Sequence, residues 1–298
     1  MRASEPVIRI LRPGEEAALE AFLLPRIASS MFLIGNMRES GLKDTGDTYS
    51  GTYAAAFDDH RITSVAAHYW NGILVLQAPA HLQEVWQAAV KASQRPIAGL
   101  TGLKDQVSVV RRALDIPASV IQLDEPEKLY SLRLADLRVP TILSTGGAHG
   151  RRIEPQDVDL LTQWRVAYSI ETQGERDRPE LWQRSRASIE RALQEGHGWV
   201  LEHSGEPVAY NAFNAAIREA VQVGGVYTPP QLRRRGYGRA VVAASLLDAR
   251  NECVEKAILF TGLRNMAAQK AYTALGFRYI GDYHMLLLEP PLPASLGV

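Results

Sequence analysis

The 298-residue sequence contains one cysteine, Cys253, so no disulfide can form within the chain and no metal site can be built from several cysteines. Positive charge is not in excess either, because 33 Lys and Arg against 33 Asp and Glu give a formal net charge of zero. A neutral chain offers no overall attraction for nucleic acid or an anionic membrane. The seven histidines show none of the paired spacings typical of metal ligands, and we expect no metal.

Long hydrophobic runs are also missing. Arg9 and Arg12 interrupt the first apolar stretch, which lacks the hydrophobic core of a signal peptide. The longest apolar helical stretch, residues 240–247, is much shorter than the roughly 20 residues that span a bilayer. We therefore expect a cytoplasmic protein with no membrane partner. At roughly 150 residues per domain, its length suggests two domains.

The second half of the chain has a regular pattern of helical and β-prone segments. Its order is helix, helix, three strands, helix, strand, helix, strand, which predicts an α/β fold with a mixed, mostly antiparallel sheet flanked by helices. The predicted helices are 155–168, 179–195, 238–253 and 265–275, and the predicted strands are 198–203, 208–217, 220–227, 257–261 and 277–288.

The first half repeats this order from its first three strands onward. Thr101-Gly102-Leu103 and Thr261-Gly262-Leu263 each lead from a strand into a helix, which supports an internal duplication. Between the halves, residues 144–150 are small, uncharged and rich in glycine, and we expect a linker there. The predicted domains are therefore 1–143 and 150–298. The predicted elements of the first are strands 52–57, 61–70, 73–76, 96–100 and 128–137, and helices 81–92 and 104–114.

The halves differ in one loop. From Pro79 to Thr101 the chain advances 22 positions, whereas from Pro229 to Thr261 it advances 32. The extra length corresponds to the segment 230–239, which contains four arginines and two glycines between a strand and a helix. The unpaired N–H groups and positive dipole at a helix start favour an anion, and glycines let it approach the backbone. Arginines can bind phosphate oxygens in a bidentate manner.

Other interpretations of this loop fit less well. A dinucleotide-binding fingerprint needs a small residue three positions after Gly238, where Val241 stands, and no Gly-Lys-Ser/Thr sequence is present for a P-loop. A solvated basic turn remains the simplest alternative. Nucleic-acid binding would require more basic and aromatic neighbours than this neutral chain has.

Three motifs follow one another through this half of the chain. They are Gly225-Val226-Tyr227-Thr228-Pro229, then Arg233-x-x-Gly236-x-Gly238, then Asn265 and Tyr272 before Leu275-Gly276-Phe277. Together they resemble the GNAT N-acetyltransferase superfamily, whose acetyl-CoA motif is Gln/Arg-x-x-Gly-x-Gly/Ala between a strand and a helix. The resemblance covers residues 154–288 in element order. It implies two tandem GNAT-like domains, of which the N-terminal one is degenerate and lacks the CoA loop.

The resemblance implies acetyl-CoA as cosubstrate and assigns roles to particular residues. The loop N–H groups would bind the pyrophosphate, the end of strand 220–227 would pair with the pantetheine arm, and the Val226 N–H would face the thioester oxygen. Asn265 and Tyr272 lie two helical turns apart on one face, separated by about 10 Å along the axis. The cofactor-binding set is Val226, Tyr227, Thr228, Arg233, Arg234, Arg235, Gly236, Tyr237, Gly238, Arg239 and Asn265.

Acyl transfer to an amine needs a base or water chain to take a proton, and a donor for the leaving thiolate. Tyr272 matches the family's donor, and since tyrosine is ordinarily a weaker acid than a thiol it would act mainly by hydrogen bonding. As base we select Glu171, in the loop that borders the acceptor site in this family, with Glu175 and Glu219 as alternatives. Each of these residues also has a plain structural interpretation, as a core tyrosine or solvated carboxylates.

The sequence thus predicts an N-acetyltransferase acting on a small-molecule or peptide amine, without a nucleic-acid partner. The alternative is a non-catalytic acetyl-CoA sensor or regulatory module. Whether a longer acyl chain is transferred, and whether the protein is a monomer or a homodimer, are left open. The acceptor has no signature in the sequence.

Overall fold

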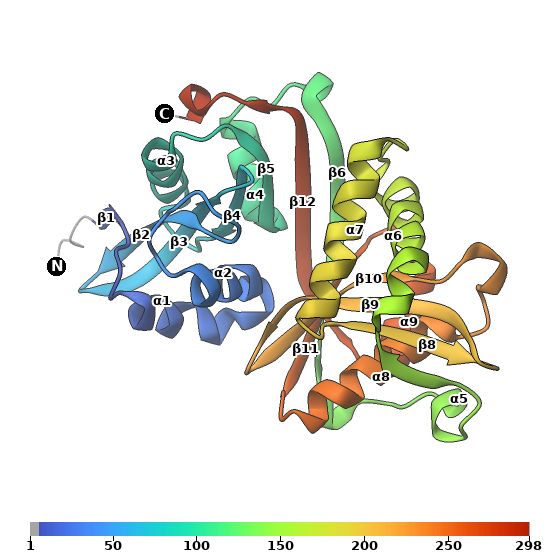
Figure 1. The fold of residues 1–298 in the computed structure, drawn as a ribbon. Helices are drawn as coiled ribbons and strands as arrows, with labels where there is room; N and C mark the ends of the chain where they lie inside the picture. The colour runs from blue at the N-terminus through green and yellow to red at the C-terminus, as the bar shows by residue number, and fades with distance from the viewer. Residues whose placement is uncertain (1–5, 298) are drawn as a thin grey trace. The chain divides into compact units, whose positions relative to one another are not determined.

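The structure, a computed structural model, describes residues 6–297 of the chain. It contains two compact units, one formed by Met1–Lys128 with Gly281–Val298 and the other by Leu129–Ile280. Each unit is a mixed sheet covered by helices (Figure 1). The predicted α/β class is therefore confirmed.

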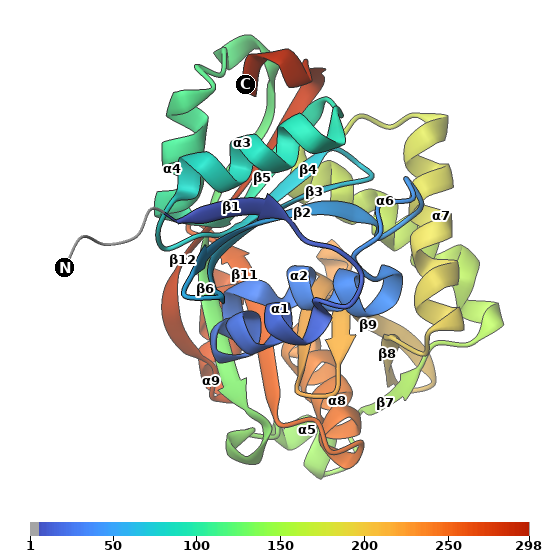
Figure 2. The same ribbon diagram turned by 90° about the vertical axis from the view of Figure 1, so that its left-hand side faces the viewer.

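Unit 1 has a sheet in the order β1-β2-β3-β4-β5-β12. All neighbouring strands are antiparallel except β4 and β5. Helices α1 and α2 cover one face of this sheet and α3 covers the other (Figure 2). The elements are β1 (Val7–Ile10), α1 (Glu16–Leu23), η1 (Leu24–Arg26), α2 (Ile27–Ser40), β2 (Gly51–Asp58), β3 (Arg61–Tyr69), β4 (Ile73–Gln77), α3 (Leu82–Ser93), β5 (Ile97–Leu103), α4 (Lys104–Ala113), η2 (Ala118–Val120), β6 (Ile121–Arg133), β12 (Arg278–Leu292) and η6 (Ala294–Gly297).

The helical stretch Glu16–Ser40 was not among the predicted elements. By length and composition it is apolar enough to cross a membrane. In the structure, however, Leu19, Met31 and Ile34 are buried, and Ser29 and Ser30 donate hydrogen bonds to the Gln77 side chain of β4. Within unit 1 this stretch therefore serves as a core helix pair.

Unit 2 has the sheet order β11-β10-β9-β8-β7, in which only β10 and β11 are parallel. Helices α6 and α7 lie on one face of this sheet and α8 on the other (Figure 1). The elements are η3 (Leu134–Asp136), α5 (Thr141–Ser144), β7 (His149–Arg152), η4 (Pro155–Asp157), α6 (Val158–Gln173), α7 (Pro179–Gln194), β8 (Gly198–His203), β9 (Glu206–Ile217), β10 (Ala220–Tyr227), η5 (Pro230–Leu232), α8 (Tyr237–Asn251), β11 (Lys256–Gly262) and α9 (Met266–Leu275).

The compact units do not follow the predicted ranges 1–143 and 150–298. Strand β12, at the end of the second half, pairs with β5 through Tyr283 and Leu287 and so belongs to unit 1 from Gly281 onward. The end of β6, which closes the first half, belongs to unit 2, where the Leu134 N–H donates to the Glu255 carbonyl at 2.8 Å. The closing strands are thus exchanged between the halves. The boundary between the duplicated halves in the sequence, at residues 143–150, stays a prediction.

The predicted linker at residues 144–150 is exposed over residues 144–147, but its end is packed. His149–Arg152 forms β7 beside β8, and Ala148 is buried in the core of unit 2. A Cβ on Gly150 would lie only 2.2 Å from the Cβ of Ala244. This glycine therefore allows α8 to approach the strand closely, and its small size reflects close packing, not flexibility.

Candidate active site

The two parallel strands of unit 2 separate at their carboxyl ends. Their pairing runs from Ala220–Lys256 to Val223–Leu259, although β10 continues to Tyr227 and β11 to Gly262. The last four residues of β10 thus extend beyond the described pairs with β11. A strand that leaves its neighbour in this way exposes an edge on which an extended ligand can form main-chain hydrogen bonds.

A bulge bends β10 at the point of separation. On its other side, β10 pairs with β9 at Gly224–Ala212 and then at Tyr227–Tyr210, so two residues of β10 lie opposite one residue of β9. Gly225 has a φ of +60°, in the left-handed region that favours glycine. Bulges redirect the backbone and side chains that follow them. Here the bulge contains Val226, whose N–H the sequence assigns to the thioester oxygen.

The Arg/Gly loop leads from the end of β10 to the start of α8. Arg234 and Gly236 have φ values of +64° and +83°, which turn the chain sharply before the helix. Gly236 is the N-cap of α8 and no side chain caps the helix there. Gly238 lies close to the strand, since a Cβ on it would be 3.3 Å from Thr228 Oγ1. The first turn of α8 thus presents backbone donors without a side-chain cap, next to the strand end.

Arg239 provides the strongest sign of an anion-binding site. Its Nε is buried and has no hydrogen-bond partner within residues 6–297. Its Nη2 lies 3.8 Å from the position of a Cβ on Gly236. A buried, unpaired guanidinium N–H is costly unless a ligand accepts from it. Together with the exposed Arg234 and Arg235, these groups suit a phosphate or pyrophosphate.

Arg233 has a different environment from the other arginines of the loop. Its guanidinium forms two hydrogen bonds of 2.7 Å with the Glu171 carboxylate, and its Nε donates to the Thr228 carbonyl at 2.9 Å. Its Cζ also lies 5.8 Å from the centre of the Tyr227 ring. Arg233 therefore ties the end of β10 to the end of α6.

The ion pair changes the interpretation of Glu171. Arg233 lowers the pKa of Glu171 below its ordinary 4.5, so the carboxylate is charged at neutral pH and the pair is lost only as the pH falls through the lowered value. Both side chains are about two-fifths exposed or more, so solvent screens the pair and its contribution to stability is small. A carboxylate with a lowered pKa and both oxygens engaged is a poor general base. The geometry thus counts against the role that the sequence assigns to Glu171.

The remaining residues of the predicted site lie in the core or at a helix end. Tyr237 is buried, with its ring 5.4 Å from that of His203, so it faces the core and offers the cofactor only its backbone. Asn265 is the N-cap of α9 and accepts from the Ala268 N–H at 3.1 Å, which leaves its amide NH₂ as the group for a ligand. Tyr272 is 8% exposed, and its ring packs edge-on against Phe277.

Helix α6 adds aromatic and basic residues that the sequence had not brought into the site. The Trp164 ring lies 6.1 Å from that of Tyr227. Arg165 reaches the bulge, since its Nη1 would be 3.4 Å from a Cβ on Gly225. Residues 164, 165, 168 and 171 recur at helical spacing, and this periodicity is the signal that could have placed them together.

The first half has no counterpart of this arrangement. Strands β4 and β5 pair up to Leu76–Gly102, and β4 ends one residue later. The next N–H, of Ala78, donates to the Gln106 side chain at 2.9 Å, and the Ala80 N–H donates to Ser64 Oγ at 3.1 Å. Side chains of unit 1 itself therefore occupy donors after β4, in agreement with a degenerate N-terminal half.

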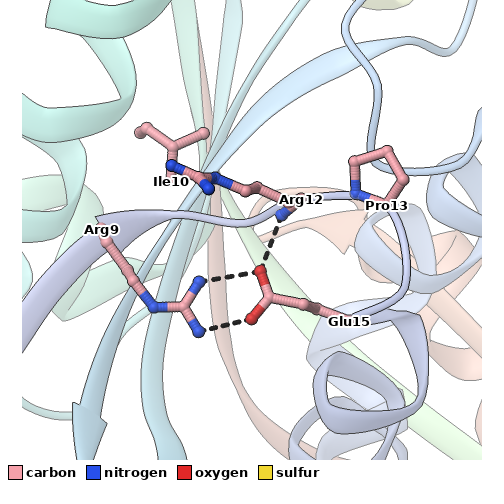
Figure 3. A pocket seen from close by; sticks show the side chains of 5 residues that line it. All are labelled: Arg9, Ile10, Arg12, Pro13 and Glu15. Carbon is pink, nitrogen blue, oxygen red and sulfur yellow. Dashed lines mark hydrogen bonds and ion pairs between the residues drawn. The ribbon is translucent and has the colours of Figure 1, made fainter.

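An open pocket of about 650 Å³ lies in unit 1, at residues 9–15 (Figure 3). Arg9 and Glu15 form an ion pair there, and the Arg12 N–H also donates to that carboxylate at 2.8 Å. The charges of Arg9 and Glu15 are thus paired with each other, so the pocket offers less for a ligand than the Arg/Gly loop. Among residues 6–297 no group of three or more His, Cys, Asp or Glu could hold a metal ion.

Comparison with known proteins agrees with the fold of both halves. A Drosophila protein solved by X-ray crystallography matches with a TM-score of 0.63 at 14% identity over 95% of this chain and 98% of its own. A tandem GNAT protein from the clavulanic acid biosynthesis pathway matches with a TM-score of 0.55 at 12% identity, over 95% of this chain and 98% of its own. A GCN5-related N-acetyltransferase from Sphaerobacter thermophilus gives 0.54 at 12% identity, over 95% of each chain. The protein therefore has a tandem GNAT fold.

A match to a protein family lies in the second half of the chain. Residues 161–277 match the model of the acetyltransferase (GNAT) family. This range contains the separated strands, the Arg/Gly loop, Asn265 and Tyr272. The resemblance to the GNAT superfamily that the motifs predict is confirmed for this part of the chain. A comparison with curated proteins gives no match.

Proposed function

We propose that the protein is an acetyl-CoA-dependent N-acetyltransferase whose active site lies in unit 2. The observation that carries this proposal is the start of α8, where uncapped backbone donors and the buried, unpartnered Nε of Arg239 lie beside the separated end of β10. An anion at one end of an open strand edge is the chemistry that a diphosphate with an extended amide arm requires.

The chain offers groups for the pyrophosphate and the pantetheine arm of coenzyme A. The N–H groups of residues 234–239 and the Arg239 guanidinium would bind the pyrophosphate. The main chain of Val226 and Thr228 would pair with the amides of the arm. Asn265 would add its side-chain NH₂, since its oxygen already caps α9. Arg233 would hold the loop in place through Thr228 and Glu171 and would not itself bind phosphate.

Acetyl-CoA supplies the acetyl group as a reactive thioester. The Val226 N–H, fixed by the bulge, would stabilise the negative charge that develops on the carbonyl oxygen. Tyr272 would hydrogen-bond the leaving sulfur. Because the amine nitrogen gains a bond to the acetyl carbon as the carbon–sulfur bond breaks, one proton leaves the amine and one reaches the thiolate.

Water is the proton acceptor that we propose for the amine. Glu171 is engaged by Arg233, and Glu175 forms ion pairs with Arg178 and Arg184. With these two carboxylates paired, the amine would lose its proton to solvent, before or during attack. The pairing of these two carboxylates thus favours a water-mediated route over Glu171 or Glu175 as the base.

Ligand binding and turnover test the proposal separately. Millimolar acetyl-CoA should raise the melting temperature, and free thiol should appear when amines are added, with peptide N-termini, lysine, polyamines and amino acids as a panel. An unchanged melting temperature at millimolar acetyl-CoA would contradict the proposal. Butyryl-CoA and octanoyl-CoA in the same assay would show whether longer acyl groups are accepted.

A non-catalytic acetyl-CoA sensor is the second candidate. The observations in its favour are the paired state of Glu171 and the burial of Tyr272, which leave the site without an evident proton-transfer group. A sensor would bind acetyl-CoA without thiol release from any amine of the panel. It would also be indifferent to Tyr272→Phe.

A further inference from the structure

Arg165 of α6 is a half-buried cation at the bulge of β10 that the roles above do not use. Its Nη1 lies 3.4 Å from the position of a Cβ on Gly225, which places the guanidinium beside the backbone at the bulge. Its Cζ lies 5.1 Å from the centre of the Tyr168 ring, which holds it by a cation–π contact. The guanidinium is thus positioned at the bulge by its own helix.

Among residues 6–297, no anionic side chain is paired with Arg165. Its guanidinium forms no ion pair or hydrogen bond with these residues, whereas Arg233 on the neighbouring loop is fully engaged by Glu171. The nearest tyrosine along β9 is Tyr210, whose Cε1 lies 3.9 Å from the same Cβ position on Gly225. Burial raises the pKa of Tyr210 to about 12, so this hydroxyl carries no charge at neutral pH. The Arg165 guanidinium is therefore available to bind an anion from a ligand.

The position of Arg165 indicates which ligand supplies that anion. The phosphate site proposed above is at the start of α8, at the opposite end of the segment 226–236 from Gly225. The guanidinium instead lies next to Val226, where the acetyl group would be presented and where the attacking amine must arrive. A group bound to Arg165 would therefore be part of the amine, close to its nitrogen.

We propose that Arg165 binds a carboxylate of the acceptor, so that the substrate is an amine carrying a carboxylate near its nitrogen, as amino acids do. This inference rests on the proposed function, because it takes the acetyl group to lie at Val226. A planar carboxylate matches the fork of donors on a guanidinium, which would orient the amine toward the bulge. Polyamines and other purely cationic acceptors would be disfavoured by charge repulsion.

Matched pairs of amines test the proposal. Glycine and glycinamide, β-alanine and β-alaninamide, and phenylalanine and phenylalaninamide differ only in the carboxylate. In the thiol-release assay, the kcat/KM of the carboxylate should exceed that of the matching amide about 10- to 100-fold in at least one pair. This is the difference expected for a charge-assisted hydrogen bond. In Arg165→Gln this ratio should collapse toward one, and Arg165→Lys should restore part of it. Comparing the ratio between variants cancels the different reactivities of the two amines.

Binding provides a readout that does not depend on turnover. In calorimetry with CoA present, N-acetylglycine should bind the wild-type protein at least about tenfold more tightly than N-acetylglycinamide, and Arg165→Gln should lose this preference. Arg218→Gln is the matched control, because Arg218 is an exposed arginine at the other end of β10. It should leave both the ratio and the binding unchanged.

The outcomes separate this inference from the proposed function. Equal use and equal binding of carboxylates and amides, or a preference that survives Arg165→Gln, would overturn the role of Arg165. Loss of the acetyl-CoA melting shift in Arg165→Gln, but not in Arg218→Gln, would also overturn it, since the guanidinium would then serve the cosubstrate. Absence of that shift in the wild-type protein would instead contradict the proposed function, while the calorimetry would still report on the carboxylate.

Discussion

Replacing Gly236 with alanine tests the cofactor loop against a matched glycine elsewhere in unit 2. Gly236 and Gly205 have nearly the same backbone, with φ values of +83° and +81°, and a Cβ on Gly205 would meet nothing within 4 Å. A Cβ on Gly236 would lie 3.8 Å from Arg239 Nη2 and near no other group. Both substitutions thus impose similar backbone strain, but only one places a methyl group over the proposed phosphate site.

The expected magnitudes follow from this strain. A non-glycine residue in the left-handed region costs roughly 1–2 kcal/mol. At about 2–4 °C per kcal/mol for a domain of this size, both variants should melt about 2–8 °C lower without ligand. At a concentration of 100 times Kd, acetyl-CoA should add about 2.7 kcal/mol of stability to the wild-type protein, but about 1.4 kcal/mol after a tenfold loss of affinity.

Differential scanning fluorimetry with and without acetyl-CoA measures both effects. The Gly205→Ala variant should keep the full ligand-induced shift, while Gly236→Ala should lose about half of it or more. The reasoning would be refuted by a Gly236→Ala variant that is destabilised like Gly205→Ala and yet retains the whole shift. In that case the start of α8 does not bind the diphosphate.

Four further measurements address the other residues of the site. Glu171→Gln should weaken acetyl-CoA binding about 2- to 5-fold, because an exposed ion pair is lost, and should leave turnover nearly unchanged. Turnover slowed by about 100-fold or more would instead show that Glu171 is the base. Tyr272→Phe keeps the ring against Phe277, so the melting temperature should hold while kcat falls about 100-fold, and unchanged thiol release would leave Tyr272 with a packing role only. Gly238→Ala should melt at the same or a higher temperature, since alanine favours a helix, yet it should lose acetyl-CoA affinity because the methyl group would crowd Thr228; retained affinity would argue against this approach. With water as the proton acceptor, the pH profile of kcat/KM should rise with the neutral fraction of each amine, whereas an inflection common to all amines would reveal a base on the protein.

Much of the fold of unit 2 could be predicted because its strands are short, β-prone and bounded by turns. The bounds of β8 and β10 coincide with the predicted segments 198–203 and 220–227. The helical stretch Glu16–Ser40 was missed because residues outside its buried stripe, such as Phe32, are also apolar, which weakens the contrast between its faces. The exchange of the closing strands was not predictable, since alternation along a strand identifies the strand but not its partner.

The candidate site divides in the same way. The Arg/Gly loop could be identified because glycines and arginines gathered at the start of a helix favour an anion through both backbone and side chains. Glu171 and Arg233 were both selected, but their ion pair joins positions 62 residues apart, and the sequence could not show that one engages the other. Arg165 carried only the helical spacing that it shares with residues 164, 168 and 171, and a single arginine on a helix is ordinary until a backbone glycine is found beside it.

The comparison of the two halves explains why the proposed site lies in the second half. Ala78 and Thr228 follow corresponding strands, and a side chain of the same unit contacts the backbone of each. The contact is with the N–H of Ala78 but with the carbonyl of Thr228. In the first half the Ala78 N–H donates to Gln106, so this donor after the strand is already occupied. In the second half the Thr228 carbonyl accepts from Arg233, and this contact fixes the strand end without using its donor. Because Gln106 already satisfies the donor that follows β4, insertion of an Arg/Gly loop alone would not restore binding to the first half.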